Sequence, residues 1–243
     1  MQIKITFRYV IAFFALNMIM VELHEQVHIN TGYFICGCYG PRNFNVWAIG
    51  EHCALQQWSF VATLTGPLFS YALMWLGAWW IAKSSNHKKK ILGFSLLFAN
   101  LPFARIFTAL AGGGDEKVVM QAVSGNADPF ISKLNAALIV TVVCLPPMIV
   151  AYRKLNAPNR FLWITGFAMM PLIYGMLYHH IFLNWLLKKG IASNSYILGT
   201  PSLILLHFIL MLLLLIFFRK DLVQTGKRNI TKAPFFPAPQ TQS

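Results

Sequence analysis

The sequence predicts an all-α protein, a polytopic bundle of about six transmembrane helices, and three observations support this prediction. The chain of 243 residues is 57% hydrophobic and only 11% charged, whereas soluble domains carry about 25% charged residues. Its apolar residues gather in segments long enough to cross a bilayer. Short basic runs separate these segments, so the net charge of +13 indicates membrane topology, and we expect no nucleic-acid binding.

The first three helices are expected over residues 8–30, 58–81 and 91–111. A loop rich in Gly, Cys and Asn follows the first helix. Tryptophans stand at both ends of the second helix, as in an aromatic belt at the membrane surface. The third helix ends in three glycines, and we expect a polar loop from there to residue 133.

Three further helices are expected over residues 134–152, 161–187 and 201–218. Pro146-Pro147 should interrupt the first of them, because proline removes a backbone hydrogen bond. Residues 1–220 would then form one transmembrane domain, with a core at 8–116 and additional helices at 134–218. The polar, Pro-rich residues 221–243 are expected to form a disordered cytoplasmic tail.

Basic residues are distributed unevenly between the two ends of these helices. Six crossings put both termini on one side, and that side collects most of the lysines and arginines, including Lys88-Lys89-Lys90. Because cytoplasmic loops carry the excess of Lys and Arg, both termini are expected in the cytoplasm. The C-terminal end of the first helix then lies toward the outer face.

The stretch from His24 to His28, near the end of the first helix, reads H-E-x-x-H. Histidines four residues apart lie on one helix face, one turn apart, and can bind one metal ion. Glu25 is then placed to take a proton from a metal-bound water. Ionisable residues near hydrocarbon are expensive and usually functional. The alternative is that these side chains only cap a helix end at the membrane interface.

A catalytic zinc ion takes three protein ligands and leaves one position for water, so a third ligand must come from elsewhere. Asp115 is the preferred candidate, because it follows three glycines where the backbone can bend and approach another helix. Alternatively, the acidic pair at 115–116 is a solvated loop feature with Lys117 as its partner. The other candidates for the third ligand are Glu116, Glu51 and His52.

Two Gly- or Pro-containing elements follow the motif inside predicted helices: Gly66-Pro67-Leu68 and Asn100-Leu101-Pro102. Such residues break the backbone hydrogen-bond ladder of a membrane helix and are tolerated where neighbours or cavities satisfy it. The order H-E-x-x-H, G-P-L, N-x-P and then Asp resembles the site-2 protease family of intramembrane zinc metalloproteases. The resemblance covers residues 21–116.

The resemblance implies a zinc endopeptidase in the bilayer that cleaves a membrane-spanning or juxtamembrane peptide segment. It implies that His24, His28 and Asp115 bind Zn²⁺, that Glu25 is the general base, and that Asn100 holds a substrate strand by its backbone. In this chain one residue separates the asparagine from the proline, where the family has two. A glutamate follows the aspartate, where the family has glycine.

Arg105 is the one basic residue deep inside a predicted helix. It should pair with a carboxylate or line a wet cavity. Glu22 is the expected partner, since it lies about 60° from Glu25 around the same helix. Arg105 is also a substrate-binding candidate beside Asn100, because a guanidinium group can hold a carbonyl oxygen or an oxyanion.

Cys36, Cys38 and Cys53 share the loop after the first helix. In an oxidising compartment we expect one disulfide, between Cys53 and either Cys36 or Cys38. The alternatives are a structural zinc site that includes His52, or unpaired thiols. Cys144 is expected to be a small buried apolar residue.

His179 and His180 in the fifth helix suggest a haem or di-iron site. Adjacent helical residues point about 100° apart and do not easily bind one ion, although His207 could join one of them. The simpler interpretation is a set of polar residues near the membrane interface. The rival function is therefore a non-proteolytic membrane protein, either a metal-dependent redox or carrier protein or an inactive protease-like scaffold. The oligomeric state stays open.

Overall fold

The computed structural model of the chain describes residues 1–50, 53, 58–125 and 128–224. Most of these residues are helical, and the strands among them form one short hairpin. The predicted all-α bundle is confirmed. In chain order the elements are α1 (Phe7–Cys36), α2 (Ser59–Lys83), α3 (His87–Ala99), α4 (Pro102–Ala111), α5 (Asp115–Val123), α6 (Pro129–Lys154), α7 (Arg160–Tyr174), the π-helical η2 (Gly175–Leu183), α8 (Asn184–Lys188), β1 (Ser195–Ile197), β2 (Thr200–Pro201), α9 (Ser202–Phe218) and the 3-10 helix η3 (Asp221–Val223).

Among the described residues, five segments are long and apolar enough to cross a membrane, as expected of an integral membrane protein. They are α1, α2, α6 and two composite stretches, His87–Ala111 and Arg160–Lys188, and they measure 25 to 30 residues each. Helix α9 is also apolar but has only 17 residues. The expected set of about six helices therefore consists of five long segments and one shorter one.

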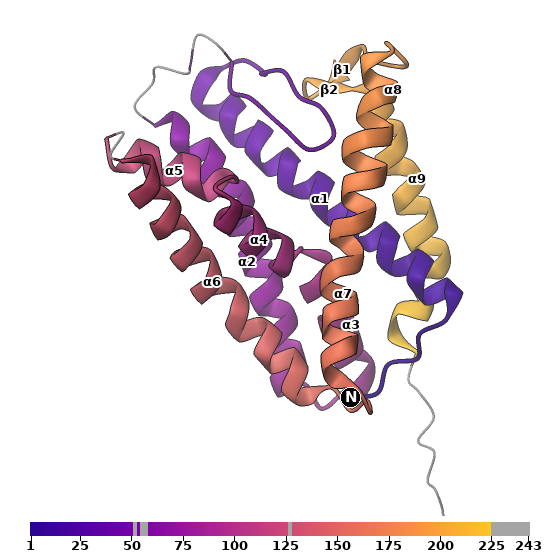
Figure 1. Ribbon diagram of the computed structural model, residues 1–243. Helices are drawn as coiled ribbons and strands as arrows, with labels where there is room; N and C mark the ends of the chain where they lie inside the picture. Colours follow the sequence, from indigo (N-terminus) through magenta and orange to yellow (C-terminus); the bar gives the residue numbers. More distant parts are fainter. Residues whose placement is uncertain (51–52, 54–57, 126–127, 225–243) are drawn as a thin grey trace, which may run out of the picture.

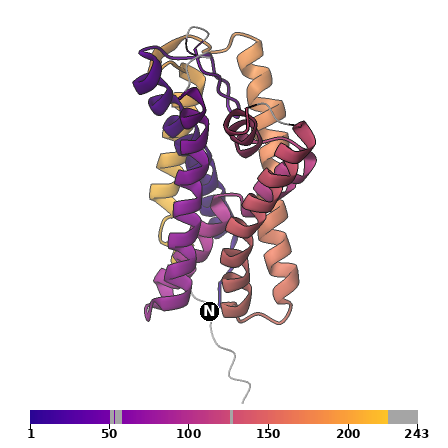
Figure 2. The same ribbon diagram turned by 90° about the vertical axis from the view of Figure 1, so that its left-hand side faces the viewer.

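Helix α1 runs obliquely through the bundle and packs against both α2 and α9 (Figure 1). In the view turned by 90°, α2 and α9 lie on one side and α7 on the other (Figure 2). The backbone N–H of Lys4 donates to the carbonyl of Gln224 at 3.4 Å. The start of the chain and the end of α9 therefore meet at one end of the bundle, as an even number of crossings requires.

The first residues of the expected disordered tail are ordered. Residues 221–223 form η3, where Asp221 and Leu222 are buried and Leu222 joins the main apolar core. This burial holds the first residues after α9 against the bundle. Residues 225–243, the rest of the expected tail, lie outside the described residues.

The expected interruption at Pro146-Pro147 is wrong. Both prolines lie inside the continuous helix α6. Helix α6 packs against α2, α4 and α5, and such tertiary packing holds a membrane helix together across a proline. The local backbone preference is therefore overridden by the neighbouring helices.

The third predicted helix is divided at Asn100 and Leu101, within the N-x-P element. Leu101 has a left-handed backbone with φ of 60°, which residues with a side chain rarely adopt. Pro102 then occupies the first turn of α4, where its missing N–H costs nothing. Asn17 of α1 donates through Nδ2 to the carbonyl of Ala99 at 2.6 Å. The break is thus satisfied by a neighbouring helix.

The polar loop expected from residue 115 begins instead with the nine-residue helix α5. Its N-cap is Gly114, whose φ of 89° lies in a region that L side chains rarely adopt. Asp115 and Glu116 occupy its first turn, where carboxylates favour the positive end of the helix dipole. The glycines therefore turn the chain sharply and aim a short helix back toward α2, against which it packs.

Candidate metal centre

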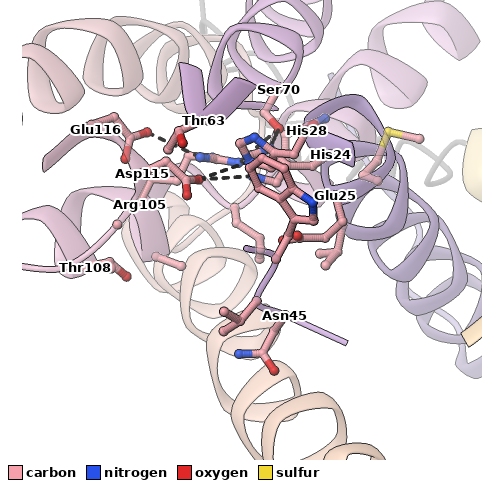
Figure 3. Close-up of a pocket in the computed structure, with 18 of the residues that line it drawn as sticks. His24, Glu25, His28, Asn45, Thr63, Ser70, Arg105, Thr108, Asp115 and Glu116 are labelled. Carbon is pink, nitrogen blue, oxygen red and sulfur yellow. Dashed lines mark hydrogen bonds and ion pairs between the residues drawn. The ribbon is translucent and has the colours of Figure 1, made fainter. Parts of the chain in front are cut away.

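His24, His28 and Asp115 point toward one another in the interior of the bundle (Figure 3). His24 Nε2 lies 3.3 Å and His28 Nε2 lies 3.4 Å from Asp115 Oδ2. The two Nε2 atoms are 3.0 Å apart. Within the described part of the chain, this is the one group of three or more His, Cys, Asp or Glu side chains gathered in this way.

The spacing of these three atoms matches three corners of a tetrahedral metal site. Ligand atoms that sit about 2.0–2.2 Å from a tetrahedral ion lie about 3.3–3.6 Å from one another. The measured separations of 3.0 to 3.4 Å are close to that spacing. Two imidazoles and one carboxylate suit Zn²⁺ and related divalent ions, and one corner of the tetrahedron stays free for water.

Helix α2 fixes the orientation of the His28 ring. His28 Nδ1 lies 2.7 Å from the carbonyl of Ala62, to which it donates, so Nε2 keeps its lone pair for a metal ion. A Cβ atom at Gly66 would overlap the His28 ring. Gly66 is thus the residue that allows α2 to approach so closely, and Pro67 follows it inside α2 without ending the helix.

A polar network supports the other histidine. His24 Nδ1 lies 3.1 Å from Ser70 Oγ, and the Arg105 guanidinium donates to the same oxygen at 3.0 Å. Arg105 Nη2 is also 2.9 Å from His24 Nδ1. On its other side Arg105 pairs with Glu116 at 3.4 Å, and Glu116 accepts a hydrogen bond from Tyr71. Arg105 therefore connects the acidic start of α5 to the histidine pair.

The two acidic residues that start α5 face different partners. The Asp115 side chain is 36% exposed and meets the histidines, whereas Glu116 is buried against Tyr71 and Arg105. Burial raises the pKa of Asp115, but hydrogen bonds from His24 and His28, which form when Nε2 of these rings carries a proton, outweigh it and hold that pKa well below its ordinary value. These surroundings favour the ionised carboxylate, which is the form that binds a metal ion.

Lys117, Glu51 and His52 are the remaining residues that the sequence placed near the acidic pair or among the metal ligands. Lys117 donates to the carbonyl of Gly112 at 3.1 Å and is not seen paired with the acidic residues. Glu51 and His52, the remaining third-ligand candidates, lie outside the described residues.

A pocket of about 610 Å³ adjoins the three ligand atoms. Glu25 lines it beside the histidines and is 7% exposed. The divided helix contributes Asn100 and Leu101 to the opposite wall. Asn100 donates through Nδ2 to the carbonyl of Leu96 at 2.8 Å, while its buried Oδ1 has no hydrogen-bond partner among the described residues. The pocket thus combines a potential metal site with an unused acceptor.

The expected pairing of Arg105 with Glu22 is wrong. Glu22 accepts two hydrogen bonds of 2.9 Å from Arg42, whose side chain is fully buried. Glu22 and Arg42 meet because the loop after α1 folds back along that helix. The sequence offered no local signal for this long-range pair, and Glu116 was the available partner for Arg105.

We call residues 42–47 the strap, because this part of the loop after α1 folds back to the pocket and supplies part of its lining. Trp47 stacks on the His28 ring, with ring centroids 5.7 Å apart and an interplanar angle of 4°. Its ring also packs on Gly32, where a Cβ would lie 2.6 Å from it. Asn45, Val46 and Trp47 line the pocket. The strap was not predicted from the sequence, since its only local signals are Pro41-Arg42 and the flanking cysteines.

A disulfide joins the two ends of the loop that contains the strap. Cys36 and Cys53 form a disulfide, one of the two pairings expected. Cys38 and Cys144 are free, and Cys144 is buried in α6 as predicted. The disulfide joins the last residue of α1 to the far end of the loop, which limits how far the strap can leave the pocket.

Comparison of the chain with models of known protein families, with curated proteins and with solved structures finds no match.

Proposed function

We propose that the chain is a membrane-embedded zinc endopeptidase. The observation that carries this proposal is the gathering of His24, His28 and Asp115 around one point, with Glu25 lining the same pocket. Two of these ligands and the glutamate form an H-E-x-x-H motif on one helix. Asp115 lies close enough to both histidines to complete a three-ligand metal site. The adjoining pocket offers space for a peptide substrate.

Zinc at this site would supply a water of lowered pKa and polarise the carbonyl under attack. Glu25 takes the proton from this water as the general base and then delivers it to the leaving amine nitrogen. Its low exposure strengthens both transfers, because few competing waters surround the carboxylate. The Ala62 carbonyl and Ser70 hydroxyl keep the two imidazoles turned toward the ion.

The substrate we propose is an apolar peptide segment within or next to the bilayer, in extended form at the pocket. A peptide in hydrocarbon keeps its backbone groups paired, so a bound extended segment needs partners from the protein. The unpaired Oδ1 of Asn100 offers an acceptor for a substrate N–H. Arg105 is engaged with Glu116, Ser70 and His24, and we therefore assign it to positioning the site instead of binding substrate.

We further propose that both termini lie in the cytoplasm. The start of the chain and the end of α9 share one end of the bundle, and the basic runs gather at that end. The metal centre then lies in the outward half of the bundle, beside a loop that the Cys36–Cys53 disulfide closes. A disulfide is favoured in an oxidising outer compartment.

The decisive test replaces Glu25 with Gln in the purified full chain. We expect cleavage of fluorogenic apolar peptides in proteoliposomes to fall by at least about 10²-fold, the usual contribution of a general base, with the zinc content unchanged. Asp128→Asn, at the exposed N-cap of α6, is the matched control and should keep full activity. Undiminished cleavage by the Glu25→Gln variant would exclude this mechanism.

A further inference from the structure

A second pair of histidines meets on the far side of α1 from α2. His179 comes from η2 and His207 from α9, and their ring centroids lie 5.2 Å apart. The two residues are only 5% and 8% exposed. In both rings Nε2 is buried and has no hydrogen-bond partner among the described residues. Two unused imidazole nitrogens thus occur at one place inside the bundle.

Such an arrangement needs a physical explanation. Leaving one buried polar atom unpaired costs about 1–3 kcal/mol, and most buried side-chain polar atoms in proteins find a partner. Polar residues inside membrane segments tend to be functional for the same reason. Two unpaired nitrogens on neighbouring rings are therefore candidate ligands for a bound group.

The distance between the rings fits a shared metal ion. Two imidazoles bound through Nε2 at a tetrahedral angle, with metal–nitrogen bonds of about 2.0–2.1 Å, have centroids about 5 Å apart. The separation of 5.2 Å agrees with this value. The ring centroids of His24 and His28 at the first centre are 4.5 Å apart, so the ring separations of the two pairs differ by less than 1 Å.

The local backbone also departs from the regular form at this pair. His179 lies within a nine-residue π-helical stretch. Long π-helical stretches are rare, and π-bulges often mark functional sites. The stretch begins four residues after Pro171, which removes one hydrogen bond of α7.

The surroundings of the second pair are mainly aromatic, and no acidic side chain completes a ligand group there among the described residues. Phe44 of the strap lies 5.3 Å from the His179 ring and 5.4 Å from the His207 ring. Tyr178 lies 5.7 Å from His207. No carboxylate or thiolate completes a three-ligand group here among the described residues. Arg42, two residues before Phe44, pairs with Glu22, but its charge still acts on His179.

These surroundings select the charge of the ion. The cost of moving an ion from water into an apolar interior grows with the square of its charge, so without a carboxylate a monovalent ion is favoured. Imidazole nitrogens suit copper. The bent arrangement that the ring separation implies requires at least one further neutral ligand on Cu⁺, such as a water, besides the two imidazoles. Aromatic rings also attract a nearby cation. We propose that His179 and His207 form a second metal site, which binds a monovalent copper ion.

The test measures Cu⁺ binding to the full chain in detergent, without oxygen, after zinc has been added to occupy the first centre. Competition with a coloured Cu⁺ chelator should show one tight site per chain. We expect His179→Asn and His207→Asn each to weaken it by at least 100-fold. His180→Asn is the matched control, because His180 Nδ1 already bonds Asn45 at 2.7 Å, and it should bind copper as the wild type does.

A second measurement keeps the proposal testable if either variant fails to fold. X-ray absorption of copper-loaded His24→Asn/His28→Asn protein should show two imidazole ligands, which only the second pair can then supply in this arrangement. Absence of tight Cu⁺ binding, or binding unaffected at both His179→Asn and His207→Asn, would overturn the proposal. A water bridging the two nitrogens is the explanation that either of those results would favour. None of these readouts depends on peptidase activity.

Discussion

The two histidine pairs of this protein differ in how they are built and in what surrounds them. His24 and His28 lie one turn apart on α1, and Asp115 faces both of them. His179 and His207 come from separate elements and pack against the aromatic rings of Phe44 and Tyr178. The first pair therefore has a negative charge to balance a divalent ion, and the second has none. A carboxylate within reach, more than the imidazoles themselves, decides which ion each pair suits.

The difference extends to the groups behind the rings. His24 and His28 have hydrogen-bond partners on their Nδ1 atoms, supplied by Ser70 and the Ala62 carbonyl. Such partners orient a metal ligand before the ion arrives. At the second pair, Phe44 packs against both rings instead. We therefore regard the first centre as held by hydrogen bonds and the second as held by packing.

The largest effect is expected when a ligand of the first pair is removed. His28→Ala should lower zinc affinity by about 10²–10³-fold, since structural zinc sites gain about 10–16 kcal/mol from all their ligands together. Competition with a zinc chelator measures this loss. His180→Ala should leave zinc binding unchanged, and equal losses in the two variants would show that the first pair is not the zinc site.

Gly66→Ala tests how closely α2 packs against the His28 ring. The added methyl group meets the His28 ring, and such overpacking costs about 1–3 kcal/mol. We expect a lower unfolding midpoint together with weaker zinc binding. Gly166→Ala is the control, because a Cβ there meets nothing within 4 Å, and it should be neutral or slightly stabilising. Unaltered zinc affinity in Gly66→Ala would contradict the close approach of α2 to His28.

The smallest of these effects concerns the support of His24. Ser70→Ala removes the oxygen that His24 Nδ1 and Arg105 share. We expect zinc affinity to fall by about 10-fold, at the low end for such supporting groups, with Cu⁺ binding at the second pair unchanged. An equal loss at both pairs would indicate a general disturbance of the bundle.

The sequence predicted those parts of the site that depend on local spacing. The motif on α1, the division of the third helix at Asn100 and the disulfide from Cys53 all follow from residues close to one another in the chain. The tilt of each helix and the meeting of distant segments were not predictable in this way. Glu22 is the expected partner of Arg105 because both are charged residues in predicted membrane helices. In the structure the loop after α1 brings Arg42 to Glu22 instead.

Helix α5 and the prolines of α6 show the other limits of local patterns. The three glycines predict the start of a loop. In the structure they form a sharp bend, and α5 begins directly after it with Asp115 and Glu116 in its first helical turn. Pro146-Pro147 was taken as a break, whereas packing keeps α6 continuous. In both cases tertiary contacts outweighed the local conformational preference of Gly or Pro.

The length of α1 has a consequence for the lipid around the protein. Its 30 residues span about 45 Å, more than the hydrocarbon thickness of about 30 Å. The helix lies obliquely in the bundle (Figure 1), which is how a long helix fits a thinner layer. Because His24 and His28 lie within its last four turns, we expect bilayer thickness to affect how near they come to the aqueous boundary, and hence how easily water enters.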